Sequence, residues 1–308
     1  MSNALLATTI SARALTRRFG AHTAVNAIDL ELTRGEVLGF LGPNGAGKTT
    51  TMQMLTGNLA PSEGEVSICG IDLLAHPVTA KAKIGYLPER PPLYRDLTVD
   101  EYLSLAVKLH RVPKARRREL IAQAKTACGL SDVGRKLIGT LSKGYQQRVG
   151  IAQAIVHEPD VLILDEPTAG LDPNQIREIR LLVRTLGGTR SVILSTHILS
   201  EVEAVCDRVQ IMNHGKIVYS ATISALKAFH SGRTIVLGLH RPPPVVELLA
   251  VAGVSAVERV DPHRFRLEFA ERDPTEALVA LSVRRDWGLF QLSPAQSSLE
   301  EVFVNLTN

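Results

Sequence analysis

The sequence predicts an α/β fold, in which a phosphate-binding core carries a helical insertion and is followed by a small α+β domain. A glycine-rich loop lies between an apolar run and a stretch of helix-forming residues, and two similar apolar runs, typical of buried parallel strands, follow later. After about residue 220 the pattern changes to strands that alternate apolar and polar residues. A chain of 308 residues, 45% of them hydrophobic, can hold one large domain and a smaller one.

The first strand leads into a phosphate-binding loop. Residues Val37–Leu41 are apolar, Gly42–Thr49 read G-x-x-x-x-G-K-T, and Met52–Leu55 favour a helix. Glycines let backbone N–H groups point at a phosphate chain, and the helix N-terminus adds partial positive charge. We expect Lys48 to reach the β- and γ-phosphates and the Thr49 hydroxyl to bind Mg²⁺. The residues expected to bind the nucleotide here are Gly42, Pro43, Asn44, Gly45, Ala46, Gly47, Lys48, Thr49 and Thr50.

Two more apolar runs end in polar residues. Asp165 and Glu166 follow Val161–Leu164, and His197 follows Ser191–Ser195 with one threonine between them. Ligands of open parallel sheets bind at the carboxyl ends of the strands. Asp165 is therefore a candidate Mg²⁺ ligand, Glu166 could orient or deprotonate an attacking water, and His197 could contact the terminal phosphate. The alternatives are two exposed turn acids and an ordinary surface histidine.

The middle of the chain, from about Pro91 to Leu141, is predicted to be helical. Apolar spacing favours helices over Val99–Leu109 and Arg117–Cys128. The basic cluster Lys114–Arg118 is interpreted as the solvated face of a helix start, with contact to anionic lipid headgroups or a membrane partner as the alternative.

The tail predicts a ferredoxin-like β-α-β-β-α-β order with an extra helix at its end. Asp273 is expected to cap the second helix, with Pro274 in its first turn. The last helix carries an apolar face over Leu299–Leu306. The expected elements are strands Arg233–Leu239, Val254–Val260, His263–Phe269 and Trp287–Leu292, and helices Val245–Ala252, one from Asp273 and one from Ser297.

Composition excludes several classes. No apolar run reaches about 18 residues, so we expect no transmembrane helix, and the first residues do not read as a secretory signal. A net charge of +4 is too small to indicate nucleic acid as a partner. The three cysteines have no metal-type spacing and indicate a reducing cytoplasm.

Several motifs together resemble those of ATP-binding cassette (ABC) proteins. Leu141–Arg148, reading LSKGYQQR, resembles the signature motif of that family, and Gly170–Pro173 resembles its D-loop. The resemblance covers about residues 8–220, and the tail resembles the accessory domain of a branch of multidrug, sodium and gliding-type exporters. It implies an ABC ATPase domain over residues 1–222, with a helical subdomain at about 90–150, and a small accessory domain over 223–308.

The resemblance also implies roles for particular residues. Two subunits are expected to sandwich two ATP molecules, so that Ser142, Gly144 and the D-loop Asp172 of one subunit act on the nucleotide of the other. Phe19 occupies the family's position for stacking on adenine, with a core phenylalanine as the alternative. Glu89 stands where the family usually has glutamine, and is assigned to the metal. The signature departs from the family's usual residues at Lys143 and Tyr145.

The implied function is a Mg²⁺-dependent ATP hydrolase that energises transport, with export favoured. Its expected partners are separate transmembrane permease subunits and a second ATPase subunit, either a copy of itself or a paired one. Its expected place is the cytoplasmic face of the inner (plasma) membrane, as a peripheral subunit. The alternative is a soluble ABC ATPase in cofactor or macromolecular assembly. A binding module without catalysis is disfavoured because Lys48, Asp165, Glu166 and His197 are all present.

Overall fold

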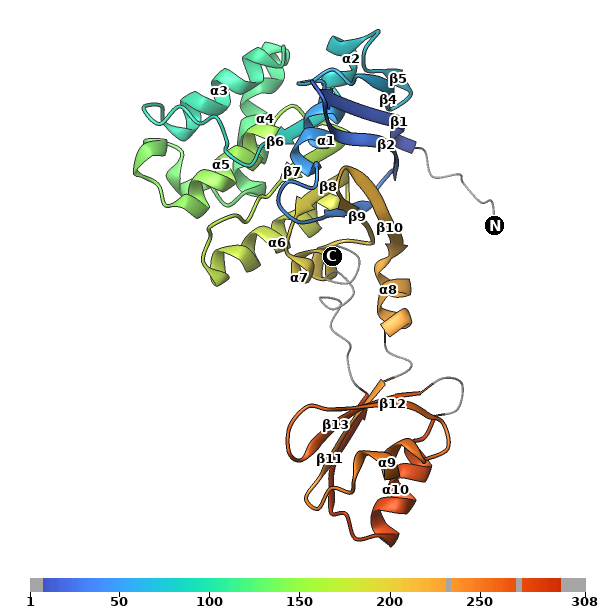
Figure 1. Ribbon diagram of the computed structural model, residues 1–308. Coiled ribbons are helices and arrows are strands. Elements are labelled where there is room, and N and C mark those ends of the chain that lie inside the picture. The colour runs from blue at the N-terminus through green and yellow to red at the C-terminus, as the bar shows by residue number, and fades with distance from the viewer. Residues whose placement is uncertain (1–7, 231–233, 270–272, 295–308) are drawn as a thin grey trace, which may run out of the picture. The chain divides into compact units, whose positions relative to one another are not determined.

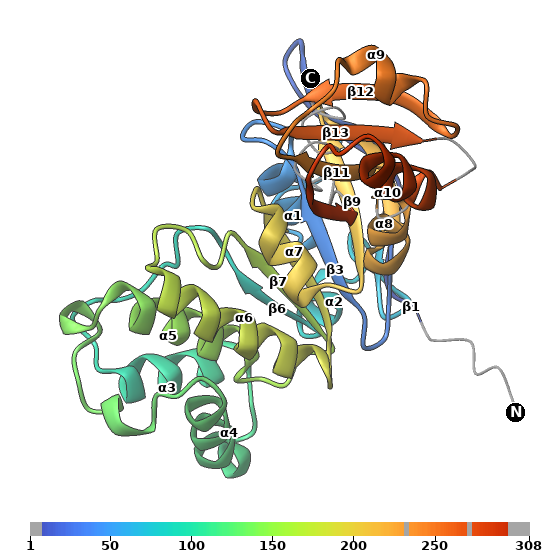
Figure 2. The same ribbon diagram turned by 90° about the horizontal axis from the view of Figure 1, so that it is seen from below.

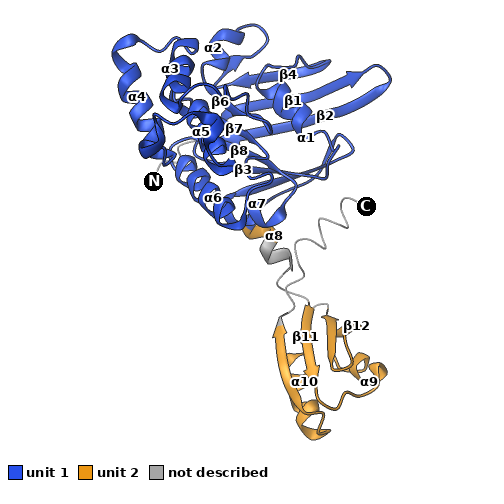
Figure 3. Ribbon diagram, turned by 90° about the vertical axis from the view of Figure 1, so that its left-hand side faces the viewer, with its two compact units in different colours: residues 1–223, 307 blue, residues 224–306, 308 orange. Residues whose placement is uncertain are grey.

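A computed structural model describes residues 8–230, 234–269 and 273–294. The chain separates into two compact units, one ending at Ile223 and one beginning at Ser224, each with its own core (Figures 1 and 3). Among the described residues, no helix is both long and apolar enough to cross a membrane.

The first unit contains a six-stranded, mostly parallel sheet ordered β10-β9-β3-β8-β7-β6. Its three central strands are the predicted apolar runs, and every residue in them is buried, as expected for strands covered on both faces. The register pairs Leu41 with Thr196 and Asp165 with Ser195, so these strands end together. The strands are β3 (Val37–Leu41), β6 (Ile84–Leu87), β7 (Val161–Asp165), β8 (Ser191–Thr196), β9 (Arg208–Asn213) and the antiparallel β10 (Lys216–Thr222).

A second, antiparallel sheet of the first unit has the order β2-β1-β4-β5. Its long strands are irregular: Ala14 in β1 and Ala27 in β2 have positive φ, where the β1–β2 register shifts. The strands are β1 (Thr8–Phe19), β2 (His22–Thr33), β4 (Glu63–Ile68) and β5 (Ile71–Asp72). Together with β3 and α1 (Lys48–Leu55) this sheet encloses the main hydrophobic core, which contains Phe40, Met52 and Leu55.

Helices α3, α4 and α5 gather on one side of the first unit, as Figures 1 and 2 show. The helix over Val99–Leu109 is confirmed, and a capping box between Thr98 and Glu101 fixes its start. The prediction for the next helix was wrong at its start, because α4 begins at Lys114 directly after Pro113 and takes in the whole basic cluster. The helices are α1, α2 (Pro77–Lys81), α3 (Val99–Leu109), α4 (Lys114–Ala127), α5 (Lys143–Ile155), α6 (Pro173–Gly187), α7 (Leu199–Val205) and α8 (Ile223–His230), with 3₁₀ turns at Ser131–Val133 and Ile138–Thr140.

The second unit has the predicted β-α-β-β-α-β order. Its antiparallel sheet is ordered β12-β13-β11-β14, and its core contains Phe265, Leu267 and Trp287. The elements are β11 (Thr234–Leu239), α9 (Val245–Leu249), β12 (Val254–Arg259), β13 (Arg264–Phe269), α10 (Thr275–Arg284) and β14 (Leu289–Pro294).

The start of α10 differs from the prediction. Pro274 precedes the helix and is not in its first turn. The N-cap is Pro274 and not Asp273, whose carboxylate accepts a hydrogen bond from the Thr275 N–H, the first donor of the helix, at 2.8 Å. The predicted final helix over Leu299–Leu306 lies outside the described residues.

Candidate nucleotide site

The phosphate loop joins β3 to α1 and depends on glycine at several positions. Gly45 and Gly47 have φ values of 80° and 108°, which disfavour residues with a Cβ. A Cβ on Gly47 would also lie 2.5 Å from the Ala24 carbonyl oxygen, and one on Gly42 would collide with the Met212 carbonyl. The loop therefore keeps its shape only with small residues packed against the neighbouring strands.

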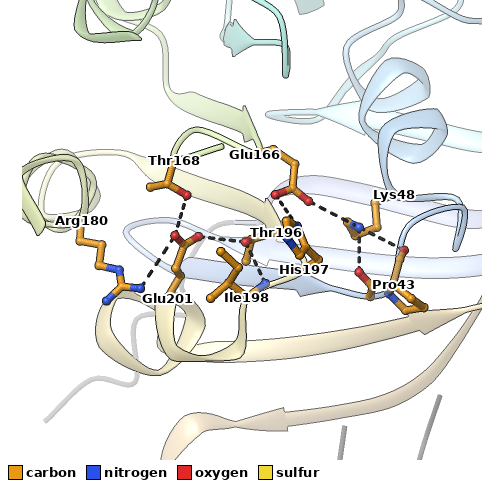
Figure 4. A network of polar contacts seen from close by, with 10 residues as sticks. Pro43, Lys48, Glu166, Thr168, Arg180, Thr196, His197, Ile198 and Glu201 are labelled. Atoms are coloured by element: carbon orange, nitrogen blue, oxygen red, sulfur yellow. Dashed lines mark hydrogen bonds and ion pairs between the residues drawn. The ribbon is translucent and has the colours of Figure 1, made fainter. Parts of the chain in front are cut away.

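Lys48 lies under this loop and is only 6% exposed. Its ammonium donates hydrogen bonds to the carbonyl oxygens of Gly42, at 2.7 Å, and Pro43, at 3.2 Å (Figure 4). The Nζ atom is also 3.6 Å from Oε1 of Glu166. A buried ammonium is tolerated here because it has hydrogen-bond acceptors and a carboxylate beside it.

Glu166 and His197 come from two adjacent strand ends and meet each other. Oε2 of Glu166 is 2.9 Å from Nδ1 of His197, and the backbone N–H of Glu166 donates to the Ser195 carbonyl at 2.9 Å. Glu166 is 7% exposed and has a φ of 48°, a conformation that costs energy in a residue with a side chain. The fold thus brings Lys48, Glu166 and His197 into one cluster, in which an acidic group contacts both a cation and a titratable ring.

Asp165 is buried at the end of β7 with 0% exposure. Neither carboxylate oxygen has a hydrogen bond of standard geometry within the described part of the chain. Burial raises the pKa of Asp165, while the nearby hydroxyls of Ser195 and Thr49 and the charge of Lys48 oppose that rise. Unsatisfied buried carboxylate oxygens are costly, and a hard divalent cation is the partner that they prefer. The Asp165 carboxylate and the nearby Thr49 hydroxyl therefore fit a Mg²⁺ ion.

The cluster opens onto a pocket of about 570 Å³. Phe19 lies at its edge with 48% exposure, which excludes the alternative of a core phenylalanine. The Arg17 guanidinium lies 4.6 Å from the centre of that ring. Glu89 is an exposed lining residue whose charge contributes to the raised pKa of Asp165. The pocket is lined by Phe19, His22, Ala24, Asn44, Gly45, Gly47, Lys48, Thr49, Thr50, Glu89, Glu166, Ala169 and His197.

Gly42, Pro43 and Ala46 of the predicted loop do not line this pocket, and neither do the three predicted nucleotide contacts outside the loop. Ser142 is the N-cap of α5, and its hydroxyl accepts from the Tyr145 N–H at 3.4 Å. Asp172 is the N-cap of α6 and accepts from the N–H groups of Asn174 and Gln175, both at 3.0 Å. Gly144 is buried against Gln175, where a Cβ would lie 2.6 Å from the amide carbon. Their roles at a nucleotide stay predictions that require a second subunit.

Sequence reasoning missed other residues. His22, Ala24 and Ala169 line the pocket, and the sequence offered no motif that would mark them. It also missed Glu201 in α7, because nothing in the sequence distinguishes this buried glutamate from an exposed one.

The fold and the site define a P-loop nucleotide-binding protein with the carboxylates of an ATP hydrolase. The family model described as "ABC transporter" matches residues 25–169. An AAA domain model described as a putative AbiEii toxin of type IV systems matches residues 138–203.

Relatives extend over nearly the whole chain. The uncharacterized ABC transporter ATP-binding protein YxlF of Bacillus subtilis is 33% identical over 97% of this chain and 99% of its own length. The daunorubicin/doxorubicin resistance ATP-binding protein DrrA of Streptomyces peucetius is 35% identical over 97% of this chain and 92% of its own length. The structure of cbiO1 from Clostridium perfringens, part of the ABC transporter complex cbiONQ, is 30% identical, with a TM-score of 0.66 over 72% of this chain and 91% of that one. The chain belongs to the ATP-binding subunits of ABC transporters, and it is an ATP-binding, ATP-hydrolysing protein of that family.

Proposed function

We propose that this subunit energises export by Mg²⁺-dependent ATP hydrolysis, as a dimer bound to separate permease subunits at the cytoplasmic face of the plasma membrane. The observation that carries the catalytic part is the cluster of Lys48, Glu166 and His197 beside the unsatisfied carboxylate of Asp165. Likeness over 97% of the chain to a daunorubicin/doxorubicin resistance ATP-binding protein supports export. A soluble assembly ATPase is the less favoured alternative.

Each residue of the site has a defined task in this proposal. Asp165, Thr49 and Glu89 would hold Mg²⁺, which supplies charge neutralisation on the phosphates when bound. Lys48 offsets phosphate charge from beneath the loop. Glu166 polarises the attacking water. His197 contacts the Glu166 carboxylate through Nδ1 at 2.9 Å and would hydrogen-bond the terminal phosphate.

The remaining predicted contacts belong to nucleotide recognition and to the dimer. Phe19 stacks on adenine from the open edge of the pocket. Ser142, Gly144 and Asp172 act on the nucleotide held by the second subunit. Binding of ATP between two subunits and its loss on hydrolysis then provide two states, closed and open, that the permease follows.

The variant Glu166→Gln tests this proposal. We expect turnover to fall by roughly 10²- to 10⁴-fold, the usual contribution of a general base, while ATP binding remains. The variant should run as a dimer in size-exclusion chromatography with ATP and Mg²⁺, and chelation of Mg²⁺ should abolish wild-type turnover. The matched control is Glu158→Gln, because Glu158 also has a positive φ, of 55°, but forms a surface ion pair with Arg116.

Two outcomes would contradict the proposal. If Glu166→Gln turns over ATP at the wild-type rate, Glu166 does not take part in the reaction. If the variant runs as a monomer in the presence of ATP and Mg²⁺, the proposed dimer is wrong. Affinity capture of the tagged variant from native membranes, followed by mass spectrometry, tests the partner. Recovery of a stoichiometric polytopic membrane protein is expected, and recovery of soluble proteins alone would favour the assembly ATPase.

A further inference from the structure

Glu201 in α7 is a carboxylate with 0% exposure that lies behind the candidate site. Its Oε1 accepts a hydrogen bond from the Thr168 hydroxyl at 2.5 Å, and its Oε2 accepts one from the Thr196 hydroxyl at 2.9 Å (Figure 4). The Arg180 guanidinium lies 3.8 Å from Oε1. Every neighbour in this network comes from a different segment of the first unit.

The two threonines adjoin the residues that meet in the pocket. Thr168 follows Glu166 by two positions, and Thr196 directly precedes His197. Both threonines are buried, at 4% and 0% exposure. Because one carboxylate bonds to both hydroxyls, it ties the loop after β7 to the end of β8 just behind the 2.9 Å contact between Glu166 and His197.

The hydrogen-bond directions require an acceptor at this position. The Thr196 hydroxyl oxygen already accepts from the Ile198 N–H at 3.1 Å, so its proton points to Glu201. An ionised carboxylate has acceptors only and can receive both threonine protons, whereas a glutamine amide presents one acceptor and one donor group. Charge-assisted bonds of this kind are short and strong, and they fix the groups that make them.

Arg180 extends the network to another part of the site. It lies on α6, whose N-cap is Asp172 of the D-loop-like segment. We propose that Glu201 is a positioning residue that sets the geometry of the Glu166–His197 pair and couples it to the segment that acts on the second subunit's nucleotide. This rests on the proposed roles of Glu166, His197 and Asp172.

The first test compares Glu201→Gln with Glu36→Gln in the full-length chain. Glu36 is a matched control: its carboxylate accepts from Arg208 at 2.6 Å and from the Thr33 N–H and hydroxyl at 2.9 and 2.8 Å. It precedes β3, at the opposite end of that strand from the phosphate loop. We expect Glu201→Gln to lower kcat about ten- to a hundredfold, as misplacement of reacting groups does, with the KM for ATP within about twofold of wild type.

Glu36→Gln should keep wild-type kcat while losing comparable thermal stability. A purely structural role of Glu201 would lower the melting temperature of both variants and leave kcat of the folded protein unchanged, and that result would overturn the proposal. Equal loss of kcat in both variants would overturn it as well.

The hydroxyl partners provide a second test, in which the serine variant and a double variant separate loss of this hydrogen bond from a general folding defect. Thr196→Val removes the proton that points to Glu201 together with the oxygen that accepts from the Ile198 N–H, whereas Thr196→Ser keeps both. We expect a lower kcat in the valine variant, near wild-type kcat in the serine variant, and no further loss when Glu201→Gln is added to Thr196→Val. Additive losses in that double variant would show that the two residues act separately.

The result for Glu166→Gln separates this proposal from the proposed function. If Glu166→Gln keeps its turnover, the assignment of the reacting pair fails. If Glu166→Gln is inactive while Glu201→Gln is fully active, only the positioning role fails.

Discussion

Replacing Gly39 by alanine is expected to displace α7 from the central sheet. Gly39 lies in the middle of β3, and a Cβ there would lie 2.5 Å from Cγ1 of Val202 and 3.1 Å from Sγ of Cys206. Both contacts belong to α7 or its C-cap, and Val202 has no exposed surface. The absence of a side chain at Gly39 therefore allows α7, the helix that carries Glu201, to pack closely against β3.

Two opposing effects set the magnitude for Gly39→Ala. Alanine in a strand is more stable than glycine by roughly 0.5–1 kcal/mol, because alanine loses less backbone entropy than glycine on folding. Overpacking of a buried site costs about 1–3 kcal/mol, and the overlap with a fully buried valine places this site within that range. The overpacking cost is larger than the entropic gain, so we expect a net loss of about 1 kcal/mol in the free energy of unfolding.

A second substitution tests the cause. Val202→Ala alone should cost about 2 kcal/mol, because two buried methyl groups are lost. In Gly39→Ala with Val202→Ala, the new methyl group occupies part of that space, so the double variant should be about 1 kcal/mol more stable than the sum of the two changes. Urea unfolding measures the free energies, and steady-state ATPase assays should show kcat reduced in Gly39→Ala and partly restored in the double variant. Strictly additive free energies would refute the close packing of α7 on Gly39.

Two further predictions concern other parts of the chain. Burial, together with the stacked ring of His110 at 3.6 Å, lowers the pKa of His157 to about 4, and its Nε2 contacts the Ile84 carbonyl at 3.0 Å. The folded state favours the neutral ring, so the contribution of His157 to the free energy of unfolding is fully present above pH 6.5 and is lost as the pH falls toward 4. The total loss is on the order of 3 kcal/mol. Urea unfolding between pH 7 and 4.5 should show this loss, and His157→Gln should flatten it; an unchanged slope would assign the loss to other groups. Phe265→Ala, at a residue 1% exposed in the second unit, should destabilise that unit by about 3–5 kcal/mol and leave ATP turnover at the wild-type rate, which calorimetry and ATPase assays check; a parallel loss of turnover would contradict the independence of the two cores.

Sequence patterns predicted the strands and helices where burial or capping determines them. Val37–Leu41 is apolar throughout because both faces of β3 are covered, and Thr98 with Glu101 marks the start of α3. The positions of Lys48, Asp165, Glu166 and His197 at one edge could be predicted, because parallel strands end at the same edge.

The rest depends on contacts between distant segments. Glu201 looks like an ordinary helix acid, and its burial becomes visible only when Thr168 and Thr196 meet it in three dimensions. The start of α10 at Thr275 follows from the local turn in which Asp273 bonds the Thr275 N–H across Pro274, a detail that the cap pattern of the sequence places one residue too early. Whether Ser142 and Gly144 touch a nucleotide depends on a second polypeptide, so neither the sequence nor one folded chain determines it.

The hydrogen bonds of Lys48 to its own loop bear on how quickly this protein can take up a ligand. A free lysine side chain has up to about 2 kcal/mol of rotational entropy to lose when it is fixed. Here the carbonyl oxygens of Gly42 and Pro43 already fix it during folding. A phosphate that arrives therefore meets an ammonium group already held in place, and capture requires an exchange of acceptors with little new ordering of the chain.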